Sequence, residues 1–268
     1  MTAPMIELVE ADAWSDMFAA APAALAQRFG MATGRIGGHR LFAMRQSAST
    51  LFNRALGSGV EGQGDIAALD AVLPWLAEHC AARWAVVLAP SAVSDALSAK
   101  LSARGLAVQT DGLMKFHRSA APVVEQPRCA YDIRLVGEDR SADFGGTAEA
   151  AFGLDAGLGE MFSALCGRPH WRTYAAYDGD TPVGVGAAYV SGDFAWLGVG
   201  ATLEGYRQRG VQSALLARRI HDAQALGAKT LTIETHRMGP TEAPNGSHRN
   251  VLRAGFTPAY FRQVFLGA

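Results

Sequence analysis

Residues 200–216 read GATLEGYRQRGVQSALL and change from a strand-like to a helix-like pattern within a few positions. The small and apolar run that ends at Thr202 is typical of a strand, and Gly205 and Gly210 mark a turn. From Gly210 onward, apolar residues recur at helical spacing: Val211, Leu215, Ile220 and Leu226. The pattern therefore predicts a strand, a glycine-containing turn and a helix in immediate succession.

A turn of this kind is suited to an anion. The start of a helix leaves several backbone N–H groups unpaired and carries a partial positive charge. Gly210 has no side chain to block the approach of a phosphate, and Arg207 and Arg209 add cations nearby. A phosphate-binding turn is one interpretation, and an ordinary solvated strand-to-helix turn is the other. The turn alone does not decide between them.

The run Y-R-x-R-G-V-x-S-A-L-L resembles motif A of the GNAT acetyltransferase superfamily, Q/R-x-x-G-x-G/A. Arg207 and Gly210 match its first two positions, whereas Gln212 stands where Gly or Ala is usual. By element order the resemblance extends over residues 131–266. It implies acetyl-CoA as cosubstrate, with the pyrophosphate in the turn and the pantetheine arm along the preceding strand. The cofactor-binding residues implied are Gly200, Ala201, Thr202, Arg207, Gln208, Arg209, Gly210, Val211, Gln212 and Ser213.

A second segment, residues 245–256, is similar to the late helix of this family, which flanks the pantetheine and ends at a Gly-Phe pair. Ser247 and Asn250 are one helical turn apart, share a face and are the implied ligand contacts. Ser247 or Asn245 acting only as a helix N-cap is the alternative.

Acetyl transfer to an amine needs a base for the amine proton, and an acid can protonate the leaving thiolate. Many GNAT enzymes carry a tyrosine acid four residues before the Gly-Phe pair, and this chain has Val251 there. The substitutes are Tyr260, Tyr206 and His248; Tyr260 is the candidate we name, with an ordinary aromatic residue on the last strand as the alternative.

Glu234 is the candidate base. It stands among apolar and β-branched residues in the strand-like run 231–235, where some family members carry a catalytic Glu. A carboxylate with apolar neighbours is suited to a raised pKa and to general-base catalysis. A half-exposed strand residue paired with a surface arginine is the alternative.

The rest of the chain suggests two copies of one fold. Residues 119–128 contain Pro122 and Pro127, show little periodicity, and divide the chain into domains 1–120 and 129–268. The second half alternates helices with antiparallel hairpins and ends in a strand–helix–strand unit, which predicts an α/β (α+β) fold with a mixed sheet. The first half repeats part of this order, but its turn at 59–64 has no arginine and an added acid. We therefore expect tandem GNAT-like acyl-CoA N-acyltransferase folds, the first degenerate.

Composition narrows the function classes. The 268 residues carry a net charge of −1, with Lys and Arg spread along the chain, which argues against nucleic acid as a partner. No signal peptide or apolar run of membrane-spanning length is visible, so we expect a cytoplasmic protein without a membrane partner. Cys80, Cys129 and Cys166 are far apart, and the spacing of His221, His236 and His248 fits no ligand set. We expect neither a disulfide framework nor a metal.

Together these features favour an acetyl-CoA-dependent N-acetyltransferase that acts by direct attack of an amine on the thioester. The N–H of Gly200 or Thr202 is the expected oxyanion donor. The acceptor is a small-molecule or peptide amine, and a homodimer is a further possibility. A non-catalytic acyl-CoA sensor is the alternative. A different nucleotide-binding module is a third interpretation, which the lack of a P-loop lysine and of G-x-G-x-x-G weakens.

Overall fold

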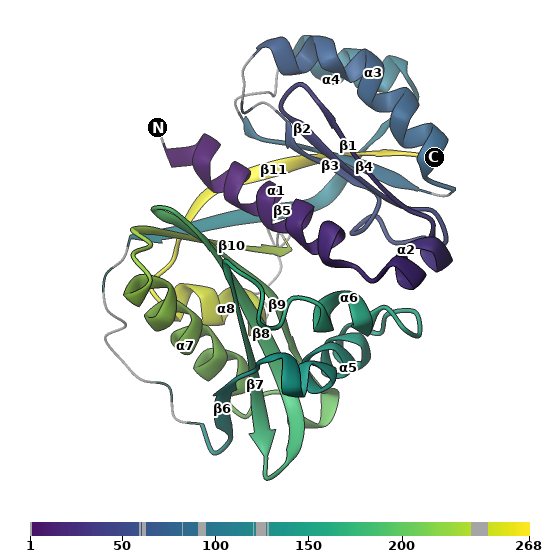
Figure 1. Ribbon diagram of the computed structural model, residues 1–268. Coiled ribbons are helices and arrows are strands. Elements are labelled where there is room, and N and C mark those ends of the chain that lie inside the picture. Colours follow the sequence, from purple (N-terminus) through teal and green to yellow (C-terminus); the bar gives the residue numbers. More distant parts are fainter. Residues whose placement is uncertain are drawn as a thin grey trace. The chain divides into compact units, whose positions relative to one another are not determined.

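The computed structural model describes residues 2–58, 60, 63–81, 83–90, 95–119, 121, 127, 129–236 and 246–268. The chain forms two compact units, whose elements are labelled in Figure 1. Unit 1 comprises residues 1–19, 23–115 and 259–268, and unit 2 comprises residues 20–22 and 116–258. Most of the predicted boundary segment 119–128, residues 59, 61 and 62 of the first-half turn, and Asn245 lie outside the described residues.

Unit 2 contains the predicted strand-turn-helix region within a mixed sheet of strand order β10-β9-β8-β7-β6. Its neighbouring strands are antiparallel except for β9 and β10, which are parallel. The elements are β6 (Asp132–Leu135), η2 (Glu138–Arg140), α5 (Ser141–Phe152), α6 (Gly159–Ser163), β7 (Trp171–Asp178), β8 (Thr181–Ser191), β9 (Phe194–Thr202), η3 (Glu204–Tyr206), α7 (Val211–Ala225), β10 (Thr230–His236) and α8 (Gly246–Arg253). The element order predicted for this half is confirmed.

Helices cover the unit 2 sheet on both faces, with α7 and α8 on one side and α5 and α6 on the other (Figure 1). Both hairpin turns predicted from Asp-Gly and Gly-Asp pairs are present, and Gly179 and Gly192 adopt the left-handed φ values of 61° and 54° that favour glycine. Val211 and Leu215 of α7 are buried against Tyr174 and Val183 of the sheet. This packing fixes the first turn of α7 beside the end of β9.

The strands of unit 1 run in the order β1-β2-β3-β4-β11-β5 and include both parallel and antiparallel neighbours. Its elements are α1 (Thr2–Ala20), α2 (Ala23–Phe29), β1 (Met31–Ile36), β2 (His39–Met44), β3 (Arg54–Ser58), α3 (Gln63–His79), β4 (Trp84–Leu88), α4 (Asp95–Ala103), β5 (Ala107–Ser119) and β11 (Thr257–Gly267). Leu73, Leu76 and Val86 belong to its buried core. From β3 to β5 strands and helices alternate, in agreement with the expected partial repeat of the second half, and the elements before residue 51 were not predicted.

The division of the chain differs from the predicted one at the C-terminal end. Residues 259–268 belong to unit 1, where β11 pairs antiparallel with β4 from Gln263–Leu88 to Gly267–Trp84. Residues 116–119, at the end of β5, belong to unit 2, where Thr232 Oγ1 donates to Phe116 O over 2.8 Å. A division at one point of the chain therefore does not describe these units.

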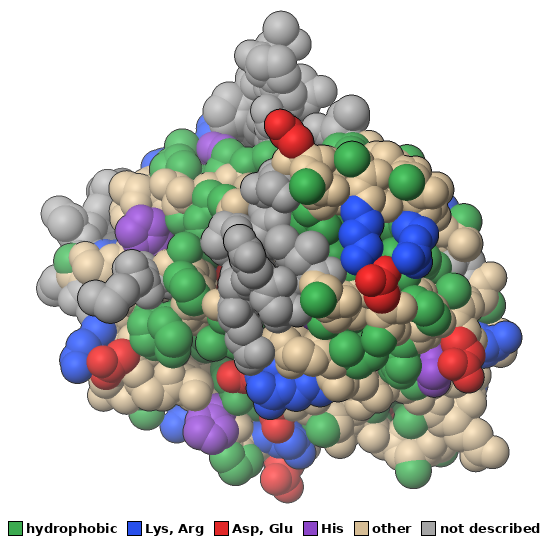
Figure 2. All heavy atoms as spheres, turned by 90° about the horizontal axis from the view of Figure 1, so that it is seen from above, with side chains coloured by type: hydrophobic (Ala, Val, Ile, Leu, Met, Phe, Trp, Pro, Cys, Tyr) green, Lys and Arg blue, Asp and Glu red, His purple; other side chains and the backbone are tan. Residues whose placement is uncertain are grey.

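Positively and negatively charged side chains lie close together on the surface. On the face shown in Figure 2, Lys and Arg side chains are interspersed with Asp and Glu side chains. In unit 1, for example, Asp70 accepts from Lys100 Nζ at 2.9 Å and from Arg104 Nη2 at 2.8 Å. Within the described part of the chain, no helix has both the length and the apolar character needed to span a bilayer.

Candidate functional site

The turn between β9 and α7 presents free backbone donors. Gly210 is the N-cap of α7 with a left-handed φ of 82°, which a glycine adopts without strain. The first helical hydrogen bond runs from Ala214 N to Gly210 O at 3.0 Å. The N–H groups of Val211, Gln212 and Ser213 precede it and have no helical acceptor. This is the geometry in which helix starts bind anions.

Three polar side chains surround this helix start. Arg207, Gln208 and Arg209 are all exposed, and Gln208 adopts a left-handed φ of 64°, which is uncommon outside glycine. Arg207 Nε donates to Thr202 O at 3.4 Å, and Arg209 Nη1 donates to the hydroxyl of Tyr131 at 3.2 Å. Both guanidinium groups are thus held near the turn by weak contacts and stay open to solvent.

The side chain of Gln212 turns back toward the sheet. Its Nε2 donates to Ala201 O at 2.6 Å and to Thr202 Oγ1 at 2.9 Å, with a longer contact to Val185 O at 3.3 Å. The departure from Gly or Ala at this motif position therefore leaves the space in front of the helix open, while the backbone N–H remains available.

Strands β9 and β10 separate beside the turn. They pair only from Thr230–Phe194 to Thr232–Trp196, although β9 continues to Thr202 and β10 to His236. The register between β8 and β9 shifts at the same place, and Val199 has a φ of 50°, an outlier for a β-branched residue. The bulge leaves residues 200–202 of β9 without a partner on β10, so their edge is available to an extended ligand.

Arg219 lies beneath this bulge and was not anticipated from the sequence. It is four residues after Leu215 on the otherwise apolar face of α7, and only 2% of it is exposed. Burial lowers the pKa of its guanidinium to about 10, so the group stays charged at neutral pH. A charged residue at a core-facing position of the helical pattern is the signal by which the sequence could have revealed it.

Helix α8 brings a further predicted pair together. Ser213 Oγ lies 3.2 Å from Asn250 Oδ1, so Asn250 meets the first turn of α7, and Ser247 is exposed one turn earlier. Val251, at the position of the family's tyrosine, is 2% exposed and belongs to the core. The ring of His248 stands edge-on to Phe116 at 5.0 Å between centroids. In this helix the place of the usual acid is thus occupied by an apolar side chain.

Glu234 lies on β10, two residues beyond Thr232, the last that pairs with β9. It is partly buried, whereas Ile233 and Thr235 on either side are buried. The structure thus places the candidate base on the diverging part of the strand, in the same unit as the turn.

Tyr260 belongs to unit 1, whereas the turn belongs to unit 2. Its hydroxyl donates to Glu7 Oε1 at 2.6 Å. Burial and the adjacent Glu7 carboxylate raise the pKa of this phenol far above its usual range. The structure thus shows Tyr260 as a partner of a buried carboxylate, and its role as the acid stays a prediction.

Glu7 and Glu10 of α1 are both buried and belong to a cluster of charges in unit 1. Arg262 Nη2 donates to Glu7 at 2.6 Å, and Arg262 Nη1 donates to Glu10 at 2.9 Å. Lys115 also pairs with Glu10, and Arg54 lies 3.9 Å from it. Burial alone would raise the pKa of Glu10, but these three cations outweigh it and hold that pKa at about 2.

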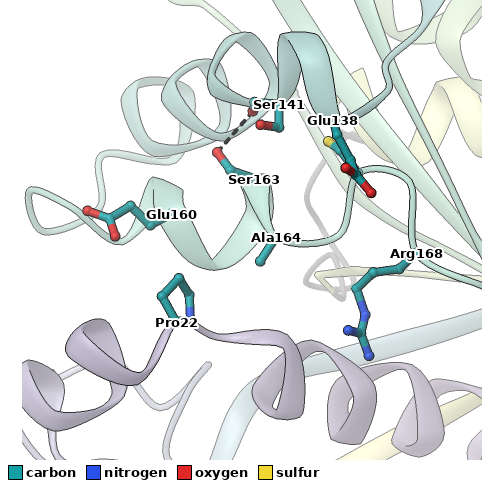
Figure 3. Close-up of a pocket in the computed structure, with 8 residues that line it drawn as sticks. Pro22, Glu138, Ser141, Glu160, Ser163, Ala164 and Arg168 are labelled. Carbon is teal, nitrogen blue, oxygen red and sulfur yellow. Dashed lines mark hydrogen bonds between the residues drawn. The ribbon is translucent and has the colours of Figure 1, made fainter.

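Two recesses occur in the described part of unit 2. One, of about 420 Å³, is lined by Pro22 and by residues of η2, α5, α6 and the following turn, with the hydroxyl of Ser163 donating to Ser141 O at 2.9 Å (Figure 3). The other, of about 440 Å³, lies between residues 127–133 and α7. No group of at least three His, Cys, Asp or Glu residues with metal-binding geometry occurs in the described ranges.

Sequence comparison supports the reading of unit 2. Residues 142–241 match the model of the acetyltransferase (GNAT) family, a span that runs from α5 through the turn and β10. Unit 2 is a GNAT domain. Among curated proteins, none matches the sequence significantly.

Solved structures extend the likeness over the whole chain. A GCN5-related N-acetyltransferase from Kribbella flavida superposes with a TM-score of 0.61 at 16% identity, covering 91% of this chain and 93% of that one. A tandem GNAT protein from the clavulanic acid biosynthesis pathway gives 0.58 at 15% identity, covering 96% and 94%. A GCN5-related N-acetyltransferase from Sphaerobacter thermophilus gives 0.59 at 15%, covering 80% and 71%. At these identities the likeness establishes the tandem GNAT fold.

Proposed function

We propose that the GNAT domain in unit 2 binds acetyl-CoA and transfers the acetyl group directly to an amine of a separate acceptor. The observation that carries the proposal is the set of free N–H groups at Val211, Gln212 and Ser213, beside a strand edge left open by the bulge. The pyrophosphate would accept from these N–H groups with Arg207 and Arg209 nearby, and the pantetheine amides would pair with residues 200–202.

The chemistry follows from this placement. The amine nitrogen attacks the thioester carbon, the carbonyl electrons move to oxygen, and backbone N–H groups at the end of β9 donate hydrogen bonds to that negatively charged oxygen. Glu234 takes the amine proton, directly or through a water molecule. Collapse of the intermediate re-forms the carbonyl and expels the CoA thiolate. The burial of Val251 means that another group or solvent protonates the thiolate.

Titration calorimetry with acetyl-CoA tests the binding step, and a thiol assay for CoA release against a panel of amines tests the transfer. We expect binding by the wild-type protein and a tenfold or greater loss of affinity in Arg207→Glu. If acetyl-CoA does not bind, or if Arg207→Glu binds it equally well, the assignment of the turn is wrong.

A non-catalytic acyl-CoA sensor is the second candidate, and the apolar Val251 at the usual acid position is the observation that favours it. Tight acetyl-CoA binding without CoA release for any amine would support the sensor. Release with even one amine would support the enzyme.

A further inference from the structure

Arg219 is a buried cation whose hydrogen-bond partners are all uncharged carbonyl oxygens. Its Nε donates to Leu215 O at 3.2 Å, and its Nη1 donates to Gly198 O at 3.1 Å and to Ala187 O at 3.4 Å. Among the described residues, no carboxylate forms an ion pair with this guanidinium. Its Nη2 atom has no hydrogen-bond partner among them. Buried charges are ordinarily paired, because leaving one uncompensated is costly.

Two glycines make room for this guanidinium. A Cβ atom on Gly186 of β8 would lie 2.8 Å from Nε of Arg219, so this position excludes any side chain unless the arginine moves. A Cβ atom on Gly200 of β9 would lie 3.1 Å from Gln212 Oε1 and 3.5 Å from Arg219 Nη2, so both side chains border this space. Gly200 is exposed, so the unpartnered Nη2 can be approached through the space that its missing side chain leaves open.

This space lies where the bulge at Val199 separates β9 from β10 and where the proposed acyl-pantetheine chain would run. We propose that Arg219 Nη2 donates a hydrogen bond to a negatively charged oxygen of the bound reactants in the space beside Gly200. This inference rests on the proposed function. Two sources share this chemistry. One is the thioester oxygen, which becomes negative as the amine adds to the carbonyl carbon. The other is a carboxylate carried by the acyl group or by the acceptor.

Each source predicts a different result for Arg219→Met, which keeps an unbranched apolar stem and removes the guanidinium with its charge. If the oxygen is that of the thioester, the Kd for acetyl-CoA stays within about threefold and kcat falls by about 100-fold, the loss typical of one oxyanion donor. If it is an acyl carboxylate, wild-type protein binds succinyl-CoA at least tenfold more tightly than acetyl-CoA, and the variant loses this preference. If it is an acceptor carboxylate, KM for the acceptor rises tenfold or more.

Gly200→Ala provides the second variant, since it retains Arg219 and adds a methyl group 3.5 Å from Nη2. The same methyl group lies 3.1 Å from Gln212 Oε1, so Gln212→Ala, measured beside it, separates an effect on Gln212 from one on Arg219. We expect Gly200→Ala to change the same parameter in the same direction, by a smaller factor. If Arg219→Met does not fold, Gly200→Ala alone tests the role of Arg219 Nη2. Failure of wild-type protein to bind acetyl-CoA would refute the proposed function. Normal binding by wild type, with kcat, Kd and KM unchanged in the folded variants, would refute the role of Arg219 alone.

Discussion

The side-chain amide of Gln212 lies 2.6 Å from the carbonyl oxygen of Ala201, so the first turn of α7 is tied to the end of β9. A second bond from the same nitrogen reaches Thr202 Oγ1 at 2.9 Å. The family position usually occupied by a small residue thus holds a long one whose polar end is satisfied by the sheet. This arrangement keeps the helix start open and links its position to that of the strand expected to bind pantetheine.

Replacement of Gln212 by Glu should break this link. A carboxylate cannot donate to two oxygen acceptors, so it would turn away from Ala201 and bring negative charge to the turn. We expect acetyl-CoA to bind at least tenfold more weakly by calorimetry. The matched control is Gln224→Glu, near the other end of α7, which loses a bond to Ala121 O of 2.7 Å. Equal losses in both variants would contradict a specific role for Gln212.

Gly210→Ala should impair both folding and binding. A non-glycine residue in the left-handed region costs about 1–2 kcal/mol, and the added methyl group narrows the approach to the helix start. Gly192→Ala is the control, because Gly192 is also left-handed and a Cβ there meets nothing within 4 Å. We expect similar decreases in the free energy of unfolding, measured in urea, and weaker acetyl-CoA binding in Gly210→Ala only. Unchanged affinity in Gly210→Ala would argue against the phosphate site.

Glu234→Gln should lower kcat by about 100-fold, within the range for loss of a general base, and leave the Kd of acetyl-CoA nearly unchanged. Single-turnover acetyl transfer and calorimetry measure the two quantities. Glu204→Gln, an exposed change in η3, should leave both unchanged. Full activity in Glu234→Gln would remove this residue from the mechanism.

Tyr260→Phe separates a structural role from a catalytic one. The variant leaves Glu7 without the 2.6 Å hydrogen bond from the phenol, and hydrogen bonds to charged groups contribute about 1.5–3 kcal/mol. We expect a lower unfolding free energy with kcat unchanged. A loss of kcat with normal stability would restore Tyr260 as a catalytic candidate.

The stability of unit 1 should depend on pH through Glu10. Its pKa is about 2 in the folded protein against an ordinary value of 4.5, so its contribution is complete above about pH 4.5 and is lost as the pH falls toward 2. Calorimetric unfolding between pH 6 and 3 should show a steeper decrease for wild type than for Glu10→Gln. Asp193→Asn removes an exposed pair with Lys229 and should leave the slope nearly unchanged. Parallel slopes for Glu10→Gln and wild type would contradict this assignment.

Local signals in the sequence predicted much of unit 2. The glycine turns at Gly179, Gly192 and Gly210 and the helical spacing from Val211 are short-range features, and each is present. Strand β9 (Phe194–Thr202) ends at Thr202, as predicted. These features sufficed to locate the candidate turn because its donors come from consecutive residues.

Long-range pairing was not accessible in the same way. The environment of Tyr260 depends on Glu7, 253 positions away, and nothing in the local pattern indicates that contact. Glu7 and Glu10 of helix α1 are buried. Because charged residues occupy core-facing positions, the apolar residues of this helix do not show a clear helical spacing. Arg219 was likewise not anticipated, because its carbonyl partners at Ala187 and Gly198 are known only once β8 and β9 are placed.

The placement of β11 between β4 and β5 has a consequence for biosynthesis. Unit 1 contains the earliest segment of the chain and also residues 259–268, so its sheet lacks an interior strand until that late segment has left the ribosome. Until then β4 and β5 each expose an unpaired edge, the kind of edge that recruits foreign strands. Residues 116–258 are synthesised during this interval. The strands of unit 1 are therefore completed only after residues 116–258 have been synthesised, and the nascent chain depends on protection of those edges while the GNAT domain is being made.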